Sequence, residues 1–413
     1  QTKTGGSAGL CFDRSKRTET HMRILFDSKL SQFKTPFGTL KKQEVCTLHI
    51  MIPCSCRTTA VCLVLQAENG AELRRVPFAK QLDDTLYDTW GGEMAVCGAG
   101  LYFYYFHITT QDGAFRLFKQ GESDTNMEDG GLWQLSVLED KFPVPDDCAG
   151  AVMYQIFVDR FYNGDPTNDV EDDEYIYIGA PCKKIKDWSQ APASMDIRNF
   201  YGGDLQGVID KLDYLQDLGI EVIYFNPLFV SPSNHKYDIQ DYDYIDPHYG
   251  KIVVDDGEVL PKGAKDNIHA TKYQQRTGDL RNLEASNQLF AKLVDAMHQR
   301  GMKVILDGVF NHCGSFNKWM DRERIYEPQP DYPKGAYVSA QSPYRSFFLF
   351  HNNQDSAWPY NGTYDGWWGH DTLPKLAYEE SPDLEDYIMR IGKKWVSAPY
   401  NIDGWRLDVA ADL

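Results

Sequence analysis

The stretch KVILDGVFNH (residues 303–312) decides which fold this chain is expected to have. A short apolar run ends in Asp307, and Asn311 and His312 follow soon after. A run of this length, bounded by polar residues, is typical of a buried β-strand. The segment before it, NQLFAKLVDAMHQRG (287–301), has apolar residues at helical spacing and ends at a glycine, a common helix stop. A helix followed by a buried strand is the repeating unit of α/β folds.

The same alternation continues on both sides of this stretch. Two strands are predicted upstream, at 151–158 and 220–225, and one downstream, at 403–409. Helices are predicted at 204–219 and 381–396. Because βα units repeat, the sequence predicts a parallel sheet that is either open or closed into a barrel.

The first third of the chain has a different pattern. Residues 1–23 are polar and rich in Gly, Ser and Thr, which predicts a flexible segment. Residues 24–145 contain short β-rich runs separated by turn residues, including a hairpin signal in LYFYYFHITT, Gln-Asp-Gly and AFRLF. This spacing predicts a β-sandwich domain. The segment DKFPVPDD is interpreted as the linker into a second domain, residues 146–413.

The composition limits the partners and the location. A formal net charge of −18 repels phosphate backbones and anionic lipid surfaces, so neither nucleic acid nor a membrane is expected as a partner. No apolar run reaches the length of about 18 residues that spans a bilayer. Nine scattered cysteines include no CxxC pair, which favours free thiols in a reducing compartment. With no signal peptide visible, a cytoplasmic location is favoured, although the chain begins with Gln and its natural start is open.

Polar residues gather at the carboxyl ends of the four predicted strands, where parallel α/β folds place their active groups. Asp307 lies near the end of one strand. Arg406 and Asp408 lie two apart on another, so their side chains are expected to share one face. The arginine can hold the neighbouring carboxylate as an anion through charge-assisted hydrogen bonds and so keep it nucleophilic. A plain structural salt bridge is the alternative for this pair.

Five short motifs of the second domain form a recognisable set: YGGDLQG (201–207), SPSNHKYD (231–238), DGVFNH (307–312), LPKL (373–376) and GWRLDVA (404–410). With this set the chain resembles the α-amylase family of glycoside hydrolases, and most of all its neopullulanase, cyclomaltodextrinase and amylopullulanase branch. The resemblance implies a (β/α)8 TIM barrel, of which only about the first four βα units are present, with an inserted domain at about 312–375. It also implies that the preceding β-sandwich is a starch-binding-like domain.

The resemblance implies a role for each matching residue. Asp408 would be the nucleophile that forms a covalent glycosyl-enzyme, Arg406 would position and ionise it, and Asp307 would support the arginine. Three further residues would bind the sugar at the cleavage subsite, by hydrogen bonds or by stacking: His235, His312 and Tyr237.

The implied activity is that of a retaining α-glycoside hydrolase acting on starch, maltodextrin, pullulan or cyclodextrin. An α-glucan transglycosylase and a non-catalytic glycan-binding protein are the alternatives. The branch usually has an asparagine after LPKL, and this chain has Ala377. Members of the branch often dimerise through the N-terminal domain, so a homodimer is a further expectation.

A second kind of site is indicated by NGDPTND followed by YGGD. Oxygen ligands in a tight loop suit Ca²⁺ rather than zinc or copper, and the branch uses this loop for calcium. A loop stabilised by its own backbone through Asx turns is the alternative. The candidate ligands are Asn163, Asp165, Asn168, Asp169, Gly202 and Asp204.

A retaining glycosidase also needs a carboxylic acid as general acid and base. In the family this acid follows the fifth strand, whereas the fourth predicted strand here ends only a few residues before the last residue, Leu413. Asp412 is not supported as a substitute by the motif. The chain is therefore expected to be the front part of a longer enzyme, inactive and prone to aggregation by itself.

Overall fold

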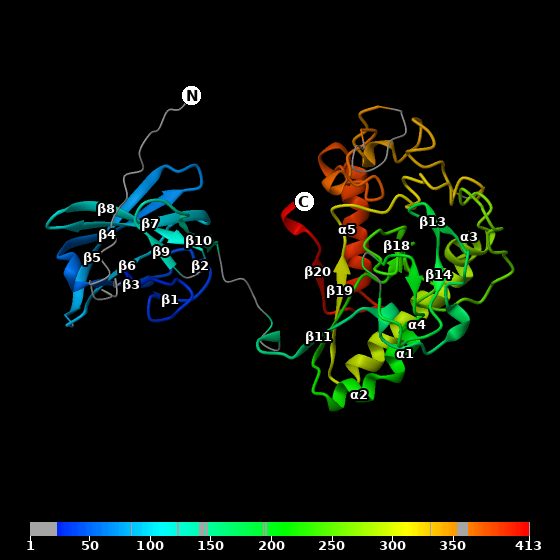
Figure 1. Cartoon of the computed structure of the whole chain (residues 1–413), viewed down its shortest axis with the longest axis horizontal. Coiled ribbons are helices and arrows are strands. Elements are labelled where there is room, and N and C mark those ends of the chain that lie inside the picture. The colour runs from blue at the N-terminus through cyan, green and yellow to red at the C-terminus, as the bar shows by residue number, and fades with distance from the viewer. Residues whose placement is uncertain are drawn as a thin grey trace, which may run out of the picture. The chain divides into compact units, whose positions relative to one another are not determined.

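The computed structural model describes residues 23–412, except 84, 122–123, 140–144, 146–147, 193, 195, 331 and 353–361. The chain divides into two compact units, Gln1–Pro145 and Asp146–Leu413 (Figure 1). The predicted flexible segment lies outside the described residues except for its last residue, and the predicted linker does so except for Pro145. No helix in the described part of the chain has both the length and the apolar content to cross a bilayer. The eight cysteines in that part carry free thiols.

The first unit consists of β-strands and is almost wholly antiparallel. Among the described strand pairs only β2 and β10 run parallel. The predicted hairpin at Gln-Asp-Gly is confirmed, since β7 and β8 pair across it. The strands are β1 (Lys34–Thr35), β2 (Leu40–Lys41), β3 (Cys46–Pro53), β4 (Thr58–Ala67), β5 (Glu72–Asp83), β6 (Tyr87–Met94), β7 (Gly100–Thr110), β8 (Gly113–Gln120), β9 (Asp124–Asn126) and β10 (Trp133–Leu138).

Strand β5 connects two groups of strands in this unit, one that contains β4 and one that contains β6. Its residues 72–78 pair with β4, whereas residues 79–83 pair with β6. The two groups close on one core that includes Ile50 of β3 and Phe106 of β7. Alternate residues of each strand point into this core, as the burial pattern of β3 shows. The all-β N-terminal region expected from the sequence is thus observed.

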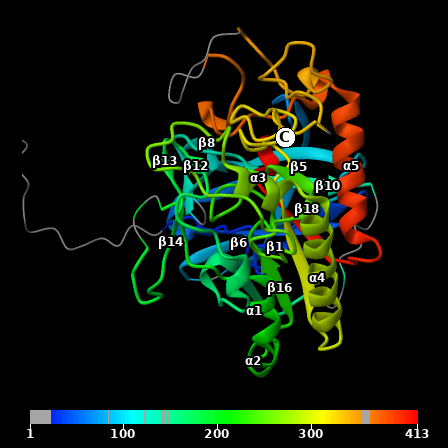
Figure 2. The ribbon, with the colours of Figure 1, turned by 90° about the vertical axis from the view of Figure 1, so that its right-hand side faces the viewer.

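The second unit contains a four-stranded parallel sheet in the order β11–β16–β19–β20. The predicted parallel α/β arrangement is therefore confirmed, and Figure 2 shows α4 and α5 along one side of the unit. The sheet strands are β11 (Met153–Ile156), β16 (Val222–Phe225), β19 (Lys303–Gly308) and β20 (Gly404–Leu407), and the helices are α1 (Leu205–Asp210), α2 (Leu212–Asp217), α3 (Thr271–Gly278), α4 (Leu280–His298) and α5 (Pro382–Val396). Short strand pairs complete the unit: β12 (Ile176–Tyr177) with β13 (Ala180–Pro181), β14 (Lys183–Lys184) with β15 (Asn199–Phe200), and β17 (Phe229–Val230) with β18 (Asp241–Ile245).

Three of the five described helices, α1, α4 and α5, begin at a residue whose side chain caps the first turn, whereas α2 and α3 have no such cap. Ser381 caps α5 by accepting the backbone N–H of Leu384, and Asp279 caps α4 in the same way. The helix predicted at 204–219 is two helices, because the backbone leaves helical geometry at Lys211. There the Lys211 N–H bonds the carbonyl of Val208, three residues back, which tightens the turn and ends α1.

The described residues of the segment 312–375 pack within the second unit and include short 3₁₀ turns. A partly buried ion cluster joins this segment to strand β18 and helix α5. The Lys318 ammonium lies 2.8 Å from Asp241 Oδ1 and 3.0 Å from Asp243 Oδ2, both on β18. Asp243 also accepts the hydroxyl of Tyr387 on α5. This cluster, Lys318–Asp241–Asp243–Tyr387, ties three segments that are far apart in the sequence.

Candidate active site

The parallel register of the sheet places the predicted catalytic residues side by side. Asp307 of β19 lies directly opposite Arg406 of β20. On the other side of β19, Tyr224 of β16 lies opposite Ile305. Residues 305 and 307 share one face of their strand, so Tyr224, Asp307 and Arg406 meet at one edge of the sheet.

The Arg406 guanidinium links the two predicted carboxylates. Its Nη1 lies 3.1 Å from each carboxylate oxygen of Asp307 and 2.6 Å from Oδ1 of Asp408. Burial alone would lower the pKa of Arg406, but these bonds raise it above its ordinary high value. The Arg406 side chain is 43% exposed, so part of it is in contact with solvent. The guanidinium therefore sits as a fixed cation between two acids.

Asp307 is fully buried, and both of its carboxylate oxygens accept hydrogen bonds. Its Oδ2 accepts the hydroxyl of Tyr237 at 2.8 Å and that of Tyr224. Burial raises the pKa of Asp307, while the two hydroxyls and Arg406 oppose the rise. The burial of Tyr224 and its hydrogen bond with Asp307 raise the pKa of the Tyr224 hydroxyl to about 12. This hydroxyl therefore stays protonated and donates. Asp307 is thus built to hold Arg406 and has no free oxygen for chemistry.

Asp408 is held differently. Its backbone N–H bonds the carbonyl of Gly308 at 3.1 Å, and its side chain is 12% exposed. Oδ1 takes the bond from Arg406, and no described residue donates a hydrogen bond to Oδ2. A carboxylate with one oxygen fixed by a guanidinium and the other free has the form that a nucleophile requires.

The two predicted sugar-binding histidines are both neutral. Burial lowers the pKa of His312 to about 4, against the attraction of Asp408. Burial also lowers the pKa of His235. The Nδ1 atom of His235 accepts the backbone N–H of Tyr237 at 3.1 Å, and that of His312 lies 3.3 Å from the amide nitrogen of Asn311. The Nε2 atom of His312 is buried, and no group within the described residues forms a hydrogen bond of ordinary distance and angle with it.

Besides Tyr224, the structure adds Trp367 and Trp368, which the sequence interpretation did not single out. Trp367 stacks on His312 with ring centroids 5.2 Å apart, and its indole N–H bonds Asp412 at 3.1 Å. Trp368 stacks on Trp367 at 5.3 Å, is 80% exposed and has a left-handed backbone with φ 51°. A large apolar ring held outward in this way is a flat face for a ligand. The only signal in the sequence was the pair of tryptophans in an aromatic-rich stretch.

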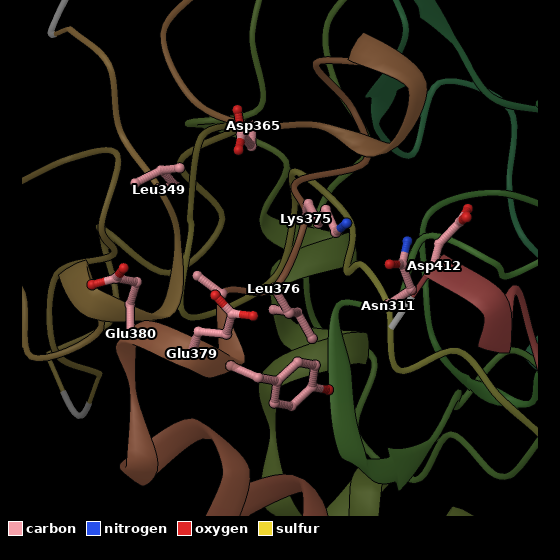
Figure 3. A pocket seen from close by; sticks show the side chains of 10 residues that line it. Asn311, Leu349, Asp365, Lys375, Leu376, Glu379, Glu380 and Asp412 are labelled. Atoms are coloured by element: carbon pink, nitrogen blue, oxygen red, sulfur yellow. The ribbon is translucent and has the colours of Figure 1, made fainter. Parts of the chain in front are cut away.

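Asn311, the neighbour of His312, helps to line a hollow of about 300 Å³. Figure 3 shows the side chains around it. Asp412 lies beside Asn311 on one side of it, and Glu379 and Glu380 lie on the other. Ala377, at the position where an asparagine was expected, also lines this hollow. Its small side chain leaves more room there than an asparagine would.

The predicted calcium ligands lie together in the loop before α1. The amide oxygens of Asn163 and Asn168 are buried and have no hydrogen-bond partner among the described residues. Asp169 accepts the Asn163 amide at 2.8 Å and pairs with the Lys184 ammonium. Gly202 has φ +82°, and a side chain there would collide with the Asp169 carboxylate. Two unpartnered oxygens and a carboxylate in one tight loop fit a hard cation.

Two of the predicted ligands are engaged elsewhere. Asp204 caps α1 and accepts the backbone N–H groups of Gly164, Asp165 and Gly207, which use both of its oxygens. Asp165 binds the Lys251 ammonium at 2.5 Å. The described residues contain no group of three or more His, Cys, Asp or Glu side chains arranged to hold a metal ion. Any cation here would depend on amide and carbonyl oxygens.

Comparison with known proteins gives a consistent result. The family model described as the catalytic domain of alpha amylase matches residues 155–267 and 284–413, which include every residue of the Arg406 site. An amylopullulanase of Thermoanaerobacter thermohydrosulfuricus is 31% identical over 92% of this chain and 25% of its own length. Neopullulanase 2 of Thermoactinomyces vulgaris is 30% identical over 85% of this chain and 50% of its own length.

A solved structure of a cyclomaltodextrinase is 26% identical and has a TM-score of 0.51, over 95% of this chain and 56% of its own. The chain spans between a quarter and a half of the length of the two curated relatives.

Proposed function

The chain belongs to the α-amylase family of glycoside hydrolases, in the branch of the amylopullulanases, cyclomaltodextrinases and neopullulanases, and from this premise we propose that it takes part in retaining hydrolysis of α-glucans. The observation that carries the proposal is the Arg406 bridge between a fully engaged Asp307 and an Asp408 with one free oxygen. Asp408 has an oxygen without a hydrogen bond among the described residues and both oxygens of Asp307 accept one, which supports Asp408 as the nucleophile and Asp307 as the residue that holds Arg406.

In this proposal Oδ2 of Asp408 attacks the anomeric carbon of an α-linked glucose. The carbon–oxygen bond to the leaving sugar breaks as the glycosyl ester forms, and water later releases the sugar with net retention. Arg406 holds Asp408 as the anion that the attack needs. His235 and His312 donate Nε2–H bonds to sugar hydroxyls, and Tyr237 offers its ring as a stacking face.

The leaving oxygen must also be protonated, and the carboxyl groups around Asp408 do not serve this step. Asp307 is saturated by its donors, and Asp412 accepts the indole N–H of Trp367. The proposal therefore covers the nucleophilic half of the reaction. A test should use a substrate whose leaving group departs without an acid.

The relatives carry names that refer to pullulan, cyclomaltodextrin and amylose-type glucans. We propose the same substrate class for this chain. Two features of the site support it: the exposed stacked face of Trp368 and the hollow enlarged at Ala377. Neutral sugars suit such a face because stacking needs no opposite charge.

The test is covalent labelling with α-maltosyl fluoride. Asp408 displaces fluoride, which leaves as the anion without protonation, and a stop in denaturant shortly after mixing traps the maltosyl ester on the enzyme. Mass spectrometry of the peptide that contains Asp408 should show the adduct. D408N should show none, whereas D403N, a control at the other end of β20, should be labelled like the wild type. An unlabelled wild type, or labelled D408N, overturns the proposal.

We also propose a structural Ca²⁺ ion at the loop before α1. Asn163, Asn168, Asp169 and the carbonyl of Gly202 would hold it, and it would cross-link this loop to the turn that precedes α1. The two unpartnered amide oxygens support this proposal. Because Lys184 already pairs with Asp169, a bound ion would share this carboxylate with the ammonium or displace it.

A further inference from the structure

Lys236 has an unusual environment for a lysine in a loop. It stands between His235 and Tyr237, the two sugar-binding candidates of the SPSNHKYD motif, yet it is only 1% exposed. Its backbone is left-handed, with φ 60°, a conformation that residues other than glycine rarely adopt. A buried charge and a strained backbone at one position need a specific compensation.

The compensation is an ion pair inside the unit. The Lys236 ammonium donates to Asp246 Oδ2 at 2.6 Å and to the Ser231 carbonyl at 3.1 Å. It also lies 4.4 Å from the ring centre of Tyr249. Both Lys236 and Asp246 are buried, so water cannot replace this bond. The side chain is therefore drawn inward, away from its two neighbours.

Asp246 is itself held by a chain of buried charges. Its other oxygen accepts Nδ1 of His248 at 2.9 Å, and Nε2 of His248 lies 2.8 Å from Glu174. Glu174 in turn accepts Arg276 of α3 at 2.8 Å. Each ring nitrogen of His248 faces a carboxylate oxygen, the arrangement that suits an imidazolium, and the two carboxylates raise the pKa of His248 against the effect of burial. Basic and acidic side chains alternate from Lys236 through Asp246, His248 and Glu174 to Arg276. These contacts link the Lys236 ammonium to helix α3.

The backbone turn at Lys236 sets the positions of its two neighbours, His235 and Tyr237. With the lysine drawn inward, Tyr237 reaches Asp307 at 2.8 Å. The backbone N–H of Tyr237 then points at Nδ1 of His235, at 3.1 Å. An N–H directed at Nδ1 places the histidine proton on Nε2. The left-handed residue thus aims the tyrosine and selects the tautomer of the histidine.

We propose that Lys236 is a positioning residue of the α-glucan site: its buried ion pair holds the loop in the conformation that presents Tyr237 and the Nε2–H of His235 to the sugar. The identity of the ligand as a sugar rests on the proposed function. The conformation of the loop and the tautomer of His235 can be measured independently of that function.

The first experiment measures the tautomer by ¹⁵N NMR of the full chain with labelled histidine. The His235 signal is identified by its loss in His235→Gln. Wild type should show protonation at Nε2, and Lys236→Met should shift the signal toward a mixture of tautomers. The matched control is Lys318→Met, which removes another buried, ion-paired lysine of the same unit. It should lower stability and leave the His235 signal unchanged.

The second experiment measures the rate of labelling by α-maltosyl fluoride. Lys236→Met should slow labelling roughly a hundredfold, the cost of a misplaced binding group. Lys236→Gly should label faster than Lys236→Met although it loses more packing, because glycine takes the left-handed conformation without an anchor. A purely structural lysine predicts the opposite order.

The outcomes separate the two proposals. If wild type is not labelled, the proposed function fails, and the tautomer result alone decides this inference. If Lys236→Met keeps the wild-type tautomer and labelling rate, the inference is wrong. Should Lys236→Met not fold, the double variant with Asp246→Asn, which leaves no unpaired charge in this pair, takes its place with the same expectations.

Discussion

Replacing Tyr237 by phenylalanine is expected to destabilise the second unit by a measurable and pH-dependent amount. The change removes one hydroxyl and keeps the ring. That hydroxyl donates to Asp307 Oδ2 at 2.8 Å, and Asp307 is fully buried, so water does not replace the lost bond. Tyr224→Phe is the matched variant, because its hydroxyl donates to the same oxygen from β16.

A hydrogen bond to a charged group contributes about 1.5–3 kcal/mol to stability. Tyr224 and Arg406 still hold Asp307 in the variant, which favours the lower part of this range, about 2 kcal/mol. For a domain of this size the melting temperature should fall by about 4–8 °C. The double variant should lose less than the sum of the two single losses, since both hydroxyls serve one oxygen.

The loss should depend on pH in a defined direction. Burial raises the pKa of Asp307 in the folded state, so its contribution to stability is fully present below the unfolded pKa and is lost as pH rises through the folded pKa. Removing a hydroxyl that stabilises the anion raises this pKa further. The destabilisation by Tyr237→Phe should therefore be largest at pH values where Asp307 is ionised, and it should shrink as pH falls through the raised pKa of Asp307.

Urea denaturation at several pH values, followed by circular dichroism, measures this directly. Equal stability of wild type and Tyr237→Phe at neutral pH would refute the reasoning. A loss that stays constant across the pH range would refute it too, because it would mean that the hydroxyl does not act on the Asp307 anion.

Three further outcomes are expected. Chelation with EDTA should lower the melting temperature of wild type by roughly 5–10 °C if calcium is bound at about 100 times its dissociation constant, and an unchanged temperature would exclude the ion. Trp368→Ala should weaken maltodextrin binding roughly tenfold in a calorimetric titration, whereas Phe37→Ala, an exposed aromatic of the first unit, should not; equal effects would contradict the Trp368 platform. Iodoacetamide should modify Cys97 and Cys148 well before Cys313, because Cys313 is buried and burial raises the pKa of its thiol, and equal rates by peptide mass spectrometry would speak against the buried placement.

Much of the second unit could be predicted because its signals are local. Short apolar runs bounded by polar residues became β11, β16, β19 and β20, and the capping residue Ser381 marked the start of α5. The first unit was predicted less completely. Strand β6 was missed because Gly91 and Gly92 weaken its local pattern, yet it pairs with both β3 and β5. Tertiary pairing overrides a low strand propensity.

The site shows the same limit. The motifs located Asp307, Arg406 and Asp408 in the chain, but their contacts depend on the register between β19 and β20, which no local pattern contains. Tyr224 was missed because a tyrosine in a buried strand is usually core packing, and only the structure shows its hydroxyl on Asp307.

Lys236 was quoted within a motif, but no local rule predicts that a lysine is buried, since lysines are mostly exposed.

The Lys318–Asp241–Asp243–Tyr387 cluster has a practical consequence for chimeric proteins. Exchanging residues 312–375 for the matching segment of a homologue would remove Lys318 while both aspartates stay in the recipient. The buried Asp241 and the half-buried Asp243 would then lose their nearer cation and keep only the Lys394 ammonium, 3.9 Å from Asp243 Oδ1, so the hybrid would be less stable regardless of how well the grafted segment suits a new substrate. A transplant across this boundary should carry the donor's counterparts of all four side chains.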